Sequence, residues 1–98
     1  MRFEWDEQKN KANLEKHGYD FSVGIIALND PDAITAEDIR KDYGEIREIT
    51  IGKIAAEIFV VVIHTERNNV TRIISVRPAN KKERRKYYEY NQNNFKRS

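Results

Sequence analysis

The stretch from Glu7 to His17 predicts a first helix whose surface is mostly polar. Asp6 precedes it and can accept hydrogen bonds from the free amides of the first turn. Gly18 follows it and favours a stop, because glycine readily adopts the left-handed conformation that ends helices. Ala12 and Leu14 are its only apolar residues, so we expect most of this helix to face water or a polar groove.

Apolar residues at helical spacing predict a second helix, which is short and buried. Phe21, Ile25 and Leu28 recur at this spacing, and Ile26 lies beside them. Pro31 follows closely and cannot continue the hydrogen bonding of a helix, so we expect the helix to end before it.

The middle of the chain changes to alternating and β-branched patterns that are typical of strands. The strongest of them, from Glu57 to Thr65, is apolar enough to be buried on both faces of a sheet. A tight turn is predicted at Asn68 and Asn69, because asparagine tolerates positive φ angles. Further strands are predicted over residues 3–5, 33–36, 46–51 and 70–77, and Pro78 ends the last of them.

Residues 80–95 predict a final helix that is rich in lysine, arginine, glutamate and tyrosine. Asn80 is a suitable N-cap, and Glu83 stands three residues later, as in a capping box. The order of the elements predicts one α+β domain over residues 1–98. We expect it to consist of two N-terminal helices, an antiparallel sheet of about four strands and a C-terminal helix.

Composition favours a cytoplasmic protein. The 98 residues include no cysteine, which suits a reducing compartment. The first residues lack the apolar stretch of a secretion signal. The longest apolar run, Ile58 to Ile63, is far shorter than the roughly 20 residues of a membrane-spanning helix. We therefore expect a soluble domain that makes no membrane contact.

Charge is unevenly distributed along the chain. Residues 1–63 carry 8 lysines and arginines against 13 acidic residues, whereas residues 64–98 carry 10 against 3. A basic half of this density predicts a surface for a polyanion such as RNA. A charged helix that is merely solvated has the same composition, so the charge alone leaves both interpretations open.

One face of the first predicted helix is a candidate site. Lys9, Asn13 and His17 are four residues apart and therefore stack on one side, with Lys16 beside them. A cation, an amide and an imidazole in a row can hold a phosphate or transfer a proton. A solvated helix face with a histidine near its C-terminus is the structural alternative.

Arginines at the ends of the predicted strands are a second candidate site. Arg67 closes the strongest strand, and Arg77 ends the next one. Strict alternation places Ser75 and Arg77 on one face of the last strand and Arg72 on the other. Arg67 lies near the turn and Arg77 at the far end, so our hypothesis requires the sheet to curve both toward a common groove.

Two guanidinium groups on one sheet suit RNA cleavage by attack of the 2′-hydroxyl on the adjacent phosphate. They bind phosphate oxygens in pairs and offset the charge of the transition state. The reaction also needs a general base and a general acid. The available groups are His17, His64, Glu66, Glu83 and Tyr88. Of these, His64 lies on an apolar strand and is more typical of a half-buried structural residue.

A basic run at the start of the final helix is a third candidate site. Residues 81–88 contain five cations and two adjacent tyrosines, which suit a nucleic-acid backbone and its stacked bases. The alternative is a helix whose tyrosines pack on the sheet while its cations are solvated. The two histidines have no ligand spacing and the glycines are isolated, so we expect neither a metal ion, a cofactor nor a phosphate loop.

Several short motifs together resemble the BrnT family of toxins, which belong to the RelE-like superfamily. The N-terminal motifs are Phe3-Glu4-Trp5-Asp6, Lys9, Asn13, Lys16-His17-Gly18 and Phe21. The central motifs are Tyr43-Gly44-Glu45, Arg47, Ile51-Gly52, Val61-Val62 and Thr65-Glu66-Arg67. The C-terminal motifs are Arg72 through Ala79, Glu83-Arg84 and Tyr87-Tyr88. They occur in the expected order over nearly the whole chain, and the departures at Val76 and Pro78 do not touch charged positions.

The resemblance implies a compact antiparallel sheet flanked by helices and a metal-independent endoribonuclease activity that is toxic to the cell. It also implies a partner, the antitoxin BrnA, which covers the toxin and binds DNA through a ribbon–helix–helix domain. The toxin would then contact DNA only indirectly, within a hetero-oligomer. On this interpretation the catalytic residues are Arg67, Arg77, His17 and Tyr88. RNA contacts are expected from Lys9, Arg47, Lys81, Lys82, Arg84 and Arg85.

Two other interpretations fit the same residues. The chain can be a non-catalytic module that binds RNA or a protein, with the basic stripe as its interface. It can also be a relic of a toxin that has lost its activity. Incubation with a long RNA in EDTA distinguishes cleavage from binding alone.

Overall fold

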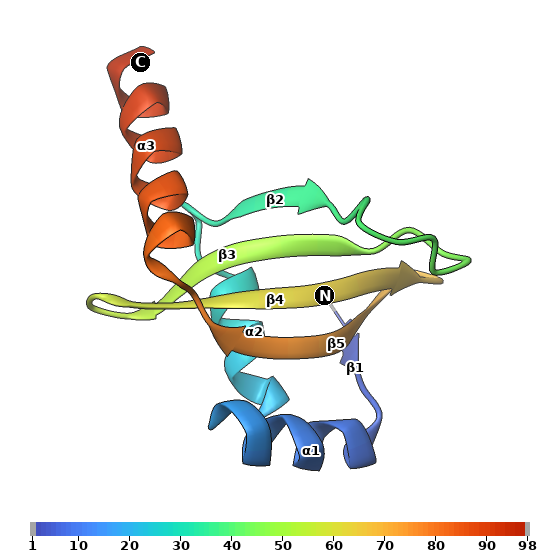
Figure 1. Cartoon of the computed structure of the whole chain (residues 1–98). Coiled ribbons are helices and arrows are strands. Elements are labelled where there is room, and N and C mark those ends of the chain that lie inside the picture. Colours follow the sequence, from blue (N-terminus) through green and yellow to red (C-terminus); the bar gives the residue numbers. More distant parts are fainter. Residues whose placement is uncertain (1, 98) are drawn as a thin grey trace.

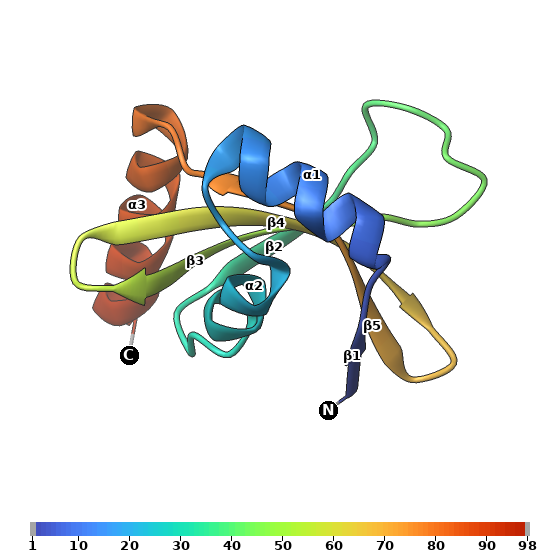
Figure 2. The same cartoon turned by 90° about the horizontal axis from the view of Figure 1, so that it is seen from below.

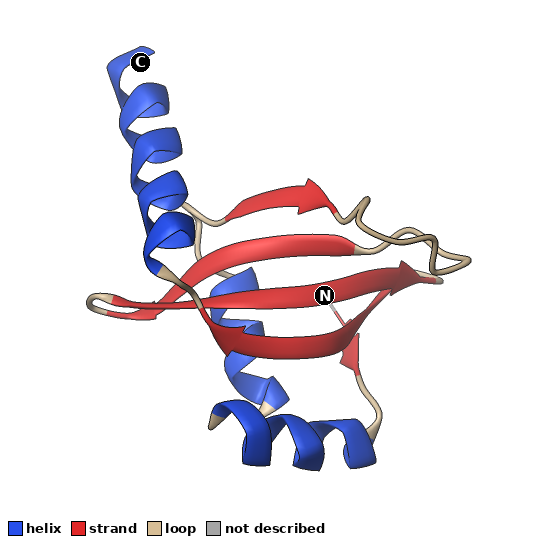
Figure 3. Cartoon of the chain, in the orientation of Figure 1, coloured by secondary structure: helices blue, strands red, loops and turns tan. Residues whose placement is uncertain are grey.

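The structure is a computed structural model that describes the backbone of residues 2–97 and the side chains of residues 2–92. Three helices and five strands follow one another within these residues (Figure 1, Figure 3). In chain order they are β1 (Arg2–Glu4), α1 (Glu7–His17), α2 (Phe21–Leu28), β2 (Ile34–Glu37), β3 (Glu48–Ala55), β4 (Ile58–Arg67), β5 (Val70–Pro78) and α3 (Lys81–Arg97).

The described strands form one sheet in the order β1-β5-β4-β3-β2. The strands from β2 to β5 form an antiparallel meander, as predicted. β1 lies at the edge and pairs in parallel with β5, with Phe3 opposite Thr71. The sheet therefore has five described strands rather than about four, and its edge strand, predicted over residues 3–5, is parallel to its neighbour rather than antiparallel.

The two N-terminal helices begin and end where their caps predict. The Asp6 carboxylate accepts hydrogen bonds from the amides of Gln8 and Lys9 at 2.9 and 3.2 Å. Gly18 adopts a φ angle of 80°, the left-handed conformation that ends α1. The side chain of Asp20 caps α2 in the same way as Asp6 caps α1. Local sequence signals therefore define both helices.

The sheet has two apolar faces, which we call the helical face and the open face. On the helical face, α1 and α2 pack on the strands (Figure 2). The buried side chains there are Phe21, Ala27, Val60, Val62, Ile73 and Val76. On the open face, α3 packs on one end of the sheet, and the buried side chains are Ile51, Phe59, Val61, Ile63, Ala79 and Tyr87. Alternate residues of β4 belong to the two clusters, which confirms that this strand is buried on both faces.

α2 approaches the sheet most closely at Gly52 of β3. A Cβ atom at this position would clash with the backbone of Ala27, first of all with its carbonyl oxygen. Only a residue without a side chain lets the helix backbone rest directly on the strand. Gly52 therefore fixes the distance between α2 and the sheet.

α1 is attached to the sheet through polar side chains. The Nδ2 atom of Asn13 donates to the carbonyls of Val76 and Tyr19 at 2.8 and 2.9 Å. Its Oδ1 atom accepts from the amide of Val76 at 3.1 Å. Asn13 is therefore a buried structural residue, and the predicted row of Lys9, Asn13 and His17 on one exposed face is wrong in this respect.

Because β5 contains a β-bulge, Arg72 lies on a different face of the sheet from the one we predicted. Ile63 pairs with Ser75, whereas the next residue, His64, pairs with Ile73, so one residue of β5 is left over between them. The alternation reverses at this point, and Arg72 lies on the same open face as Arg77. Strict alternation from the sequence had placed these two arginines on opposite faces.

The predicted turn between β4 and β5 is confirmed. Asn68 and Asn69 both have positive φ angles, 52° and 66°. Asparagine adopts this conformation more readily than other residues with a side chain. No helix in the described part of the chain is long and apolar enough to cross a membrane.

Candidate functional site

A groove lies on the open face between α3 and the strands β2 and β3. Its volume is about 400 Å³. The side chains that line it include an apolar set from the strands, Ile34, Ile49 and Ile51, and a polar set from α3, Glu83, Lys86 and Tyr90. The polar residues recur at helical spacing, so one side of α3 faces the sheet across the groove.

Arg77 lies beside this groove and is held by Glu83. Its Nη1 and Nη2 atoms donate to the two carboxylate oxygens of Glu83 at 2.8 and 2.7 Å. The predicted capping box is confirmed, because the Asn80 amide donates to Glu83 at 2.9 Å and the Glu83 amide donates to the Asn80 side chain at 2.8 Å. The same carboxylate therefore caps α3 and orients the arginine.

Arg77 keeps donors for a further anion. A guanidinium has five N–H groups. Two of them bind Glu83, and a third donates to the Pro78 carbonyl at 3.3 Å. The hydrogen bond to Glu83 raises the pKa of Arg77, whereas burial and the nearby charge of Arg40 act in the opposite direction. Arg77 is therefore a permanent cation, 31% exposed, with unused donors.

Glu83 is ionised in this setting. The hydrogen bonds from Arg77 are the main cause that lowers its pKa below the ordinary value, although burial opposes them. A carboxylate that stays ionised at neutral pH is in the form that accepts a proton, and the lowered pKa makes it a weaker base than a free carboxylate. Lys86, one turn further along α3, adds an ammonium group to the same groove, and Tyr90 adds an aromatic ring.

The structure does not bring Arg67 to Arg77. Both lie on the open face, but Arg67 pairs with Val70 beside the turn, and Arg77 pairs with Val61 near the other end of β4. Six residues at about 3.3 Å each separate the two positions by about 20 Å along the strand. Arg67 donates to Glu45 at 2.9 Å instead. The convergence of these arginines that our hypothesis required is not observed.

Arg47 makes its contacts with other residues of the loop that spans residues 38–47. Its guanidinium lies 3.9 Å from the ring centre of Tyr43. It forms an ion pair with Glu45 at 3.6 Å, which is too long for a hydrogen bond, and its Nε atom has no hydrogen-bond partner. Arg40 of the same loop pairs with Asp38 at 2.8 Å. Its charge acts on Arg77, and no sequence pattern singled out this residue.

The basic residues of α3 lie where the sequence predicted them, on an exposed surface. Lys81, Lys82, Arg84 and Arg85 are exposed, and Arg84 also donates to the Ala79 carbonyl at 3.1 Å. The adjacent tyrosines differ in role, so the alternative in which both pack on the sheet holds for only one of them. Tyr87 is buried against the sheet, whereas Tyr88 is exposed and its hydroxyl donates to Glu57 at 3.2 Å.

Lys9 and His17 lie on the other side of the sheet. α1 carries both residues and packs against β5 on the helical face. The sheet therefore stands between them and Arg77. A single phosphate cannot contact Arg77 and His17 in this arrangement.

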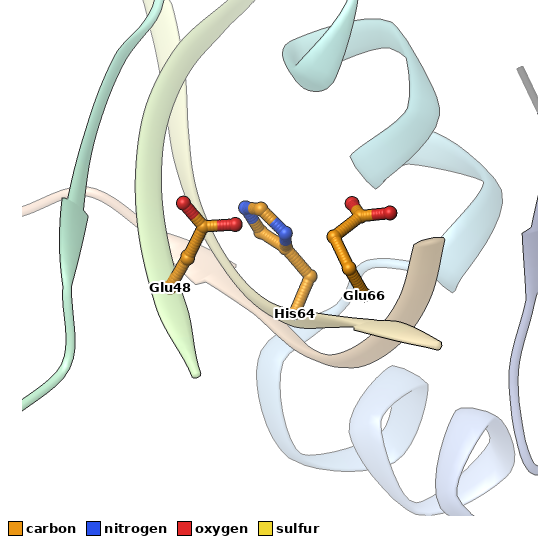
Figure 4. A group of neighbouring side chains, drawn as sticks. All are labelled: Glu48, His64 and Glu66. Carbon is orange, nitrogen blue, oxygen red and sulfur yellow. The ribbon is translucent and has the colours of Figure 1, made fainter. Parts of the chain in front are cut away.

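His64 is buried on the helical face and is flanked by Glu48 and Glu66 (Figure 4). Burial lowers the pKa of His64, although both carboxylates act to raise it, so the ring is neutral at pH 7. Its Nε2 atom lies 2.7 Å from the Thr50 hydroxyl, and its Nδ1 atom has no hydrogen-bond partner in the part of the chain that the structure describes. The sequence did not reveal this group, because Glu48 meets His64 only through the pairing of β3 with β4.

A solved structure matches this fold. It is the crystal structure at 1.1 Å resolution of the ribonuclease toxin BrnT from Brucella abortus. The two chains share 27% identical residues with a TM-score of 0.61, over 83% of this chain and 99% of that chain. This chain therefore has the fold of a small ribonuclease toxin.

A match to a protein-family model shows which family the chain belongs to. The model of the ribonuclease toxin BrnT of type II toxin–antitoxin systems matches residues 5–83. The chain belongs to this family, as its motifs predicted. The matched range ends at Glu83 and therefore includes the pair of Arg77 and Glu83. A search of curated proteins gives no match.

Proposed function

We propose that this chain is an endoribonuclease that cleaves mRNA without a metal ion, and that Arg77 holds the scissile phosphate. Membership of a ribonuclease toxin family supports the class of activity. The observation that carries the residue assignment is the position of Arg77, which Glu83 orients beside the groove of the open face. Its unused N–H donors suit a phosphate, which guanidinium groups bind through paired hydrogen bonds.

The groove also suits the rest of an RNA strand. Its apolar floor and the Tyr90 ring offer surfaces on which unpaired bases can stack. The exposed cations of α3 lie on the same helix as the groove residues Glu83 and Lys86 and suit the neighbouring phosphates. They are Lys81, Lys82, Arg84 and Arg85. RNA contacts by Lys9 and Arg47 stay predictions, as do catalytic roles of Arg67, His17 and Tyr88.

The reaction we assign to the groove needs no other reactant. The 2′-hydroxyl oxygen forms a bond to phosphorus while its proton passes to the Glu83 carboxylate. The bond from phosphorus to the 5′-oxygen breaks, and this oxygen takes a proton from the Lys86 ammonium group. Arg77 offsets the negative charge of the five-coordinate phosphorus. The products are a 2′,3′-cyclic phosphate and a 5′-hydroxyl, and water returns the proton from Glu83 to Lys86.

A family of type II toxin–antitoxin systems implies an antitoxin as partner. We expect a BrnA-like protein with a ribbon–helix–helix domain that covers the groove and forms a hetero-oligomer with this chain. Contact with DNA would then pass through the antitoxin alone. Cleavage of mRNA places the activity in the cytoplasm.

The test is growth arrest together with cleavage of a long RNA by the purified chain in EDTA. We expect the wild type to arrest growth and to give discrete fragments with 2′,3′-cyclic phosphate ends. Arg77→Ala should abolish both, because the phosphate loses its paired donors. Arg72→Ala is the matched control, since Arg72 lies on the same strand and face but pairs with Glu4 at 2.8 Å. It should retain both activities.

Three outcomes would contradict parts of the proposal. Persistent cleavage by a folded Arg77→Ala variant would remove Arg77 from the mechanism. Cleavage that requires an added metal would contradict metal independence. A gel shift without cleavage, weakening steeply with salt, would instead identify an RNA-binding module.

A further inference from the structure

A polar cluster on the helical face lies apart from the groove of the open face (Figure 4). Glu48 of β3 is directly opposite His64 of β4, and Glu66 lies two residues further along β4 on the same face. One potential ligand atom from each of the three residues lies within 4.8 Å of the others. The proposed cleavage uses none of these residues.

His64 brings an unsatisfied polar atom to this cluster. Its side chain is only 5% exposed, and its Nε2 atom lies 2.7 Å from Thr50 Oγ1. Its Nδ1 atom is buried and has no hydrogen-bond partner among the described residues. Buried polar atoms of folded proteins nearly always have a partner. Figure 4 shows the imidazole between the two carboxylates, with one ring nitrogen on the side of each.

The neighbouring threonines can fix the form of the ring that binds a cation. Thr50 Oγ1 also lies 2.7 Å from Thr35 Oγ1. When Thr50 donates its proton to Thr35, it accepts the Nε2–H of His64, and Nδ1 then carries a free lone pair. Metal-binding histidines use this arrangement, in which one nitrogen donates to a fixed oxygen. The Thr71 hydroxyl similarly donates to Glu66 Oε1 at 2.6 Å.

Among the described residues, no lysine or arginine forms an ion pair with Glu48 or Glu66. The ion pairs among the described residues involve other acidic residues, namely Glu4, Asp38, Glu45 and Glu83. The cavity beside the cluster is lined by a third acidic residue, Asp30, and by no cationic side chain. The two carboxylates and the neutral imidazole therefore form a partly buried cluster whose negative charge is not balanced by a nearby cation among the described residues.

We infer that Glu48, His64 and Glu66 bind one divalent transition-metal ion of the Zn²⁺ type. One imidazole nitrogen and two carboxylate oxygens suit Zn²⁺ or Co²⁺, whereas Mg²⁺ and Ca²⁺ prefer oxygen ligands alone. Three protein ligands leave a fourth tetrahedral position for water. Bonds of about 2.1 Å place tetrahedral ligands roughly 3.4 Å apart. The ligand atoms here lie within 4.8 Å of one another, so the carboxylates must move inward when the ion binds.

This site differs in role from the groove. The ion would link β3 to β4 on the face of the sheet opposite to Arg77. It would therefore stabilise the fold and would not contact the scissile phosphate. Metal-free cleavage and metal binding are independent properties of the two faces.

The test is a titration of the full chain with Co²⁺ in the absence of RNA, after EDTA treatment and desalting. We expect one equivalent to bind and to give the visible absorption of four-coordinate Co²⁺, which Zn²⁺ then removes. The temperature of unfolding should rise with metal concentration. Glu48→Gln and Glu66→Gln should each weaken binding about tenfold or more, because each removes a ligand charge. His17→Asn, which alters the other histidine, should bind as the wild type does.

The possible results distinguish a specific metal site at Glu48, His64 and Glu66 from adventitious metal binding elsewhere on the chain. Saturable binding that both glutamine variants weaken and His17→Asn retains would support the site. A lack of saturable binding, or equal affinity of folded Glu66→Gln and wild type, would overturn it. Loss of binding in His17→Asn would also overturn it. Circular dichroism shows whether each variant is folded, and the absence of RNA keeps these results separate from the proposed cleavage.

Discussion

Asn13 shows how much one side chain contributes to the attachment of α1. The helix is mostly polar, so it cannot be held to the sheet by a wide apolar stripe. Asn13 instead pairs with both the amide and the carbonyl of Val76, which β5 leaves free at this point. Glu83 acts similarly in α3, where one carboxylate caps the helix and orients Arg77. At both positions a polar side chain connects a helix to β5.

We predict that Asn13→Ala lowers the free energy of unfolding by about 2–4 kcal/mol. The change leaves two buried backbone groups of Val76 without partners, and each such group costs about 1–3 kcal/mol. Urea denaturation measures the effect. Lys9→Ala, one turn earlier on the exposed side of the same helix, is the control and should change stability by less than about 0.5 kcal/mol. Equal stability of the two variants would contradict the role of Asn13.

Among the elements, α2 depends most directly on backbone contact with the sheet. Its apolar residues face β3, β4 and β5, and Gly52 lets the helix backbone reach the strand. The contact that a Cβ atom would make is with backbone atoms of Ala27, which cannot turn away as a side chain can. The position of the whole helix therefore depends on this one glycine.

We predict that Gly52→Ala lowers the free energy of unfolding by at least about 1–3 kcal/mol, because the added methyl group displaces α2. Thermal unfolding followed by circular dichroism measures the loss. Ala55→Ser, at the exposed end of the same strand, should unfold close to the wild-type temperature. A Gly52→Ala variant as stable as the wild type would show that α2 adjusts without cost.

Sequence patterns predicted elements better than the contacts between them. The caps at Asp6 and Gly18, the apolar run of β4 and the box of Asn80 and Glu83 are local signals, and the structure has all of them. Arg77 also lay among the predicted site residues. Its pairing with Glu83 was not predictable, because the register and the end of β5 decide which side chains of two elements meet.

The bulge in β5 and the cluster around His64 show the same limit. One extra residue reverses the alternation and moves Arg72 to the face of Arg77. Glu48 and His64 are far apart in sequence and become neighbours only when β3 and β4 pair. Such relations depend on register, which no pattern within a single strand specifies.

The whole molecule combines groups that make it sensitive to acid in two ranges of pH. His64 is held neutral by burial, with a pKa below its ordinary value. Asp38 and Glu83 are held ionised, with pKa values below their ordinary range, chiefly by hydrogen bonds from arginines. In each case the unfolded chain binds protons more readily than the folded chain, so stability falls as the pH falls.

We predict that the free energy of unfolding decreases in two steps on acidification. The first begins near pH 6.5, where His64 of the unfolded chain takes up a proton. The second begins near pH 4, where the carboxylates of the unfolded chain do so. Urea denaturation in EDTA from pH 8 to pH 2 measures both, and His64→Gln should remove the first step. Stability that rises between pH 7 and pH 5 would contradict this prediction.

The parallel pairing of β1 with β5 joins the first described strand of the chain to the last one. A ribosome synthesises Phe3 long before its strand partner Thr71, and Arg77 and Glu83 follow later still. A nascent chain therefore can neither complete its sheet nor assemble the groove until Glu83 has emerged from the exit tunnel. The pairing of the first strand with the last therefore delays completion of the sheet until β5 has been synthesised.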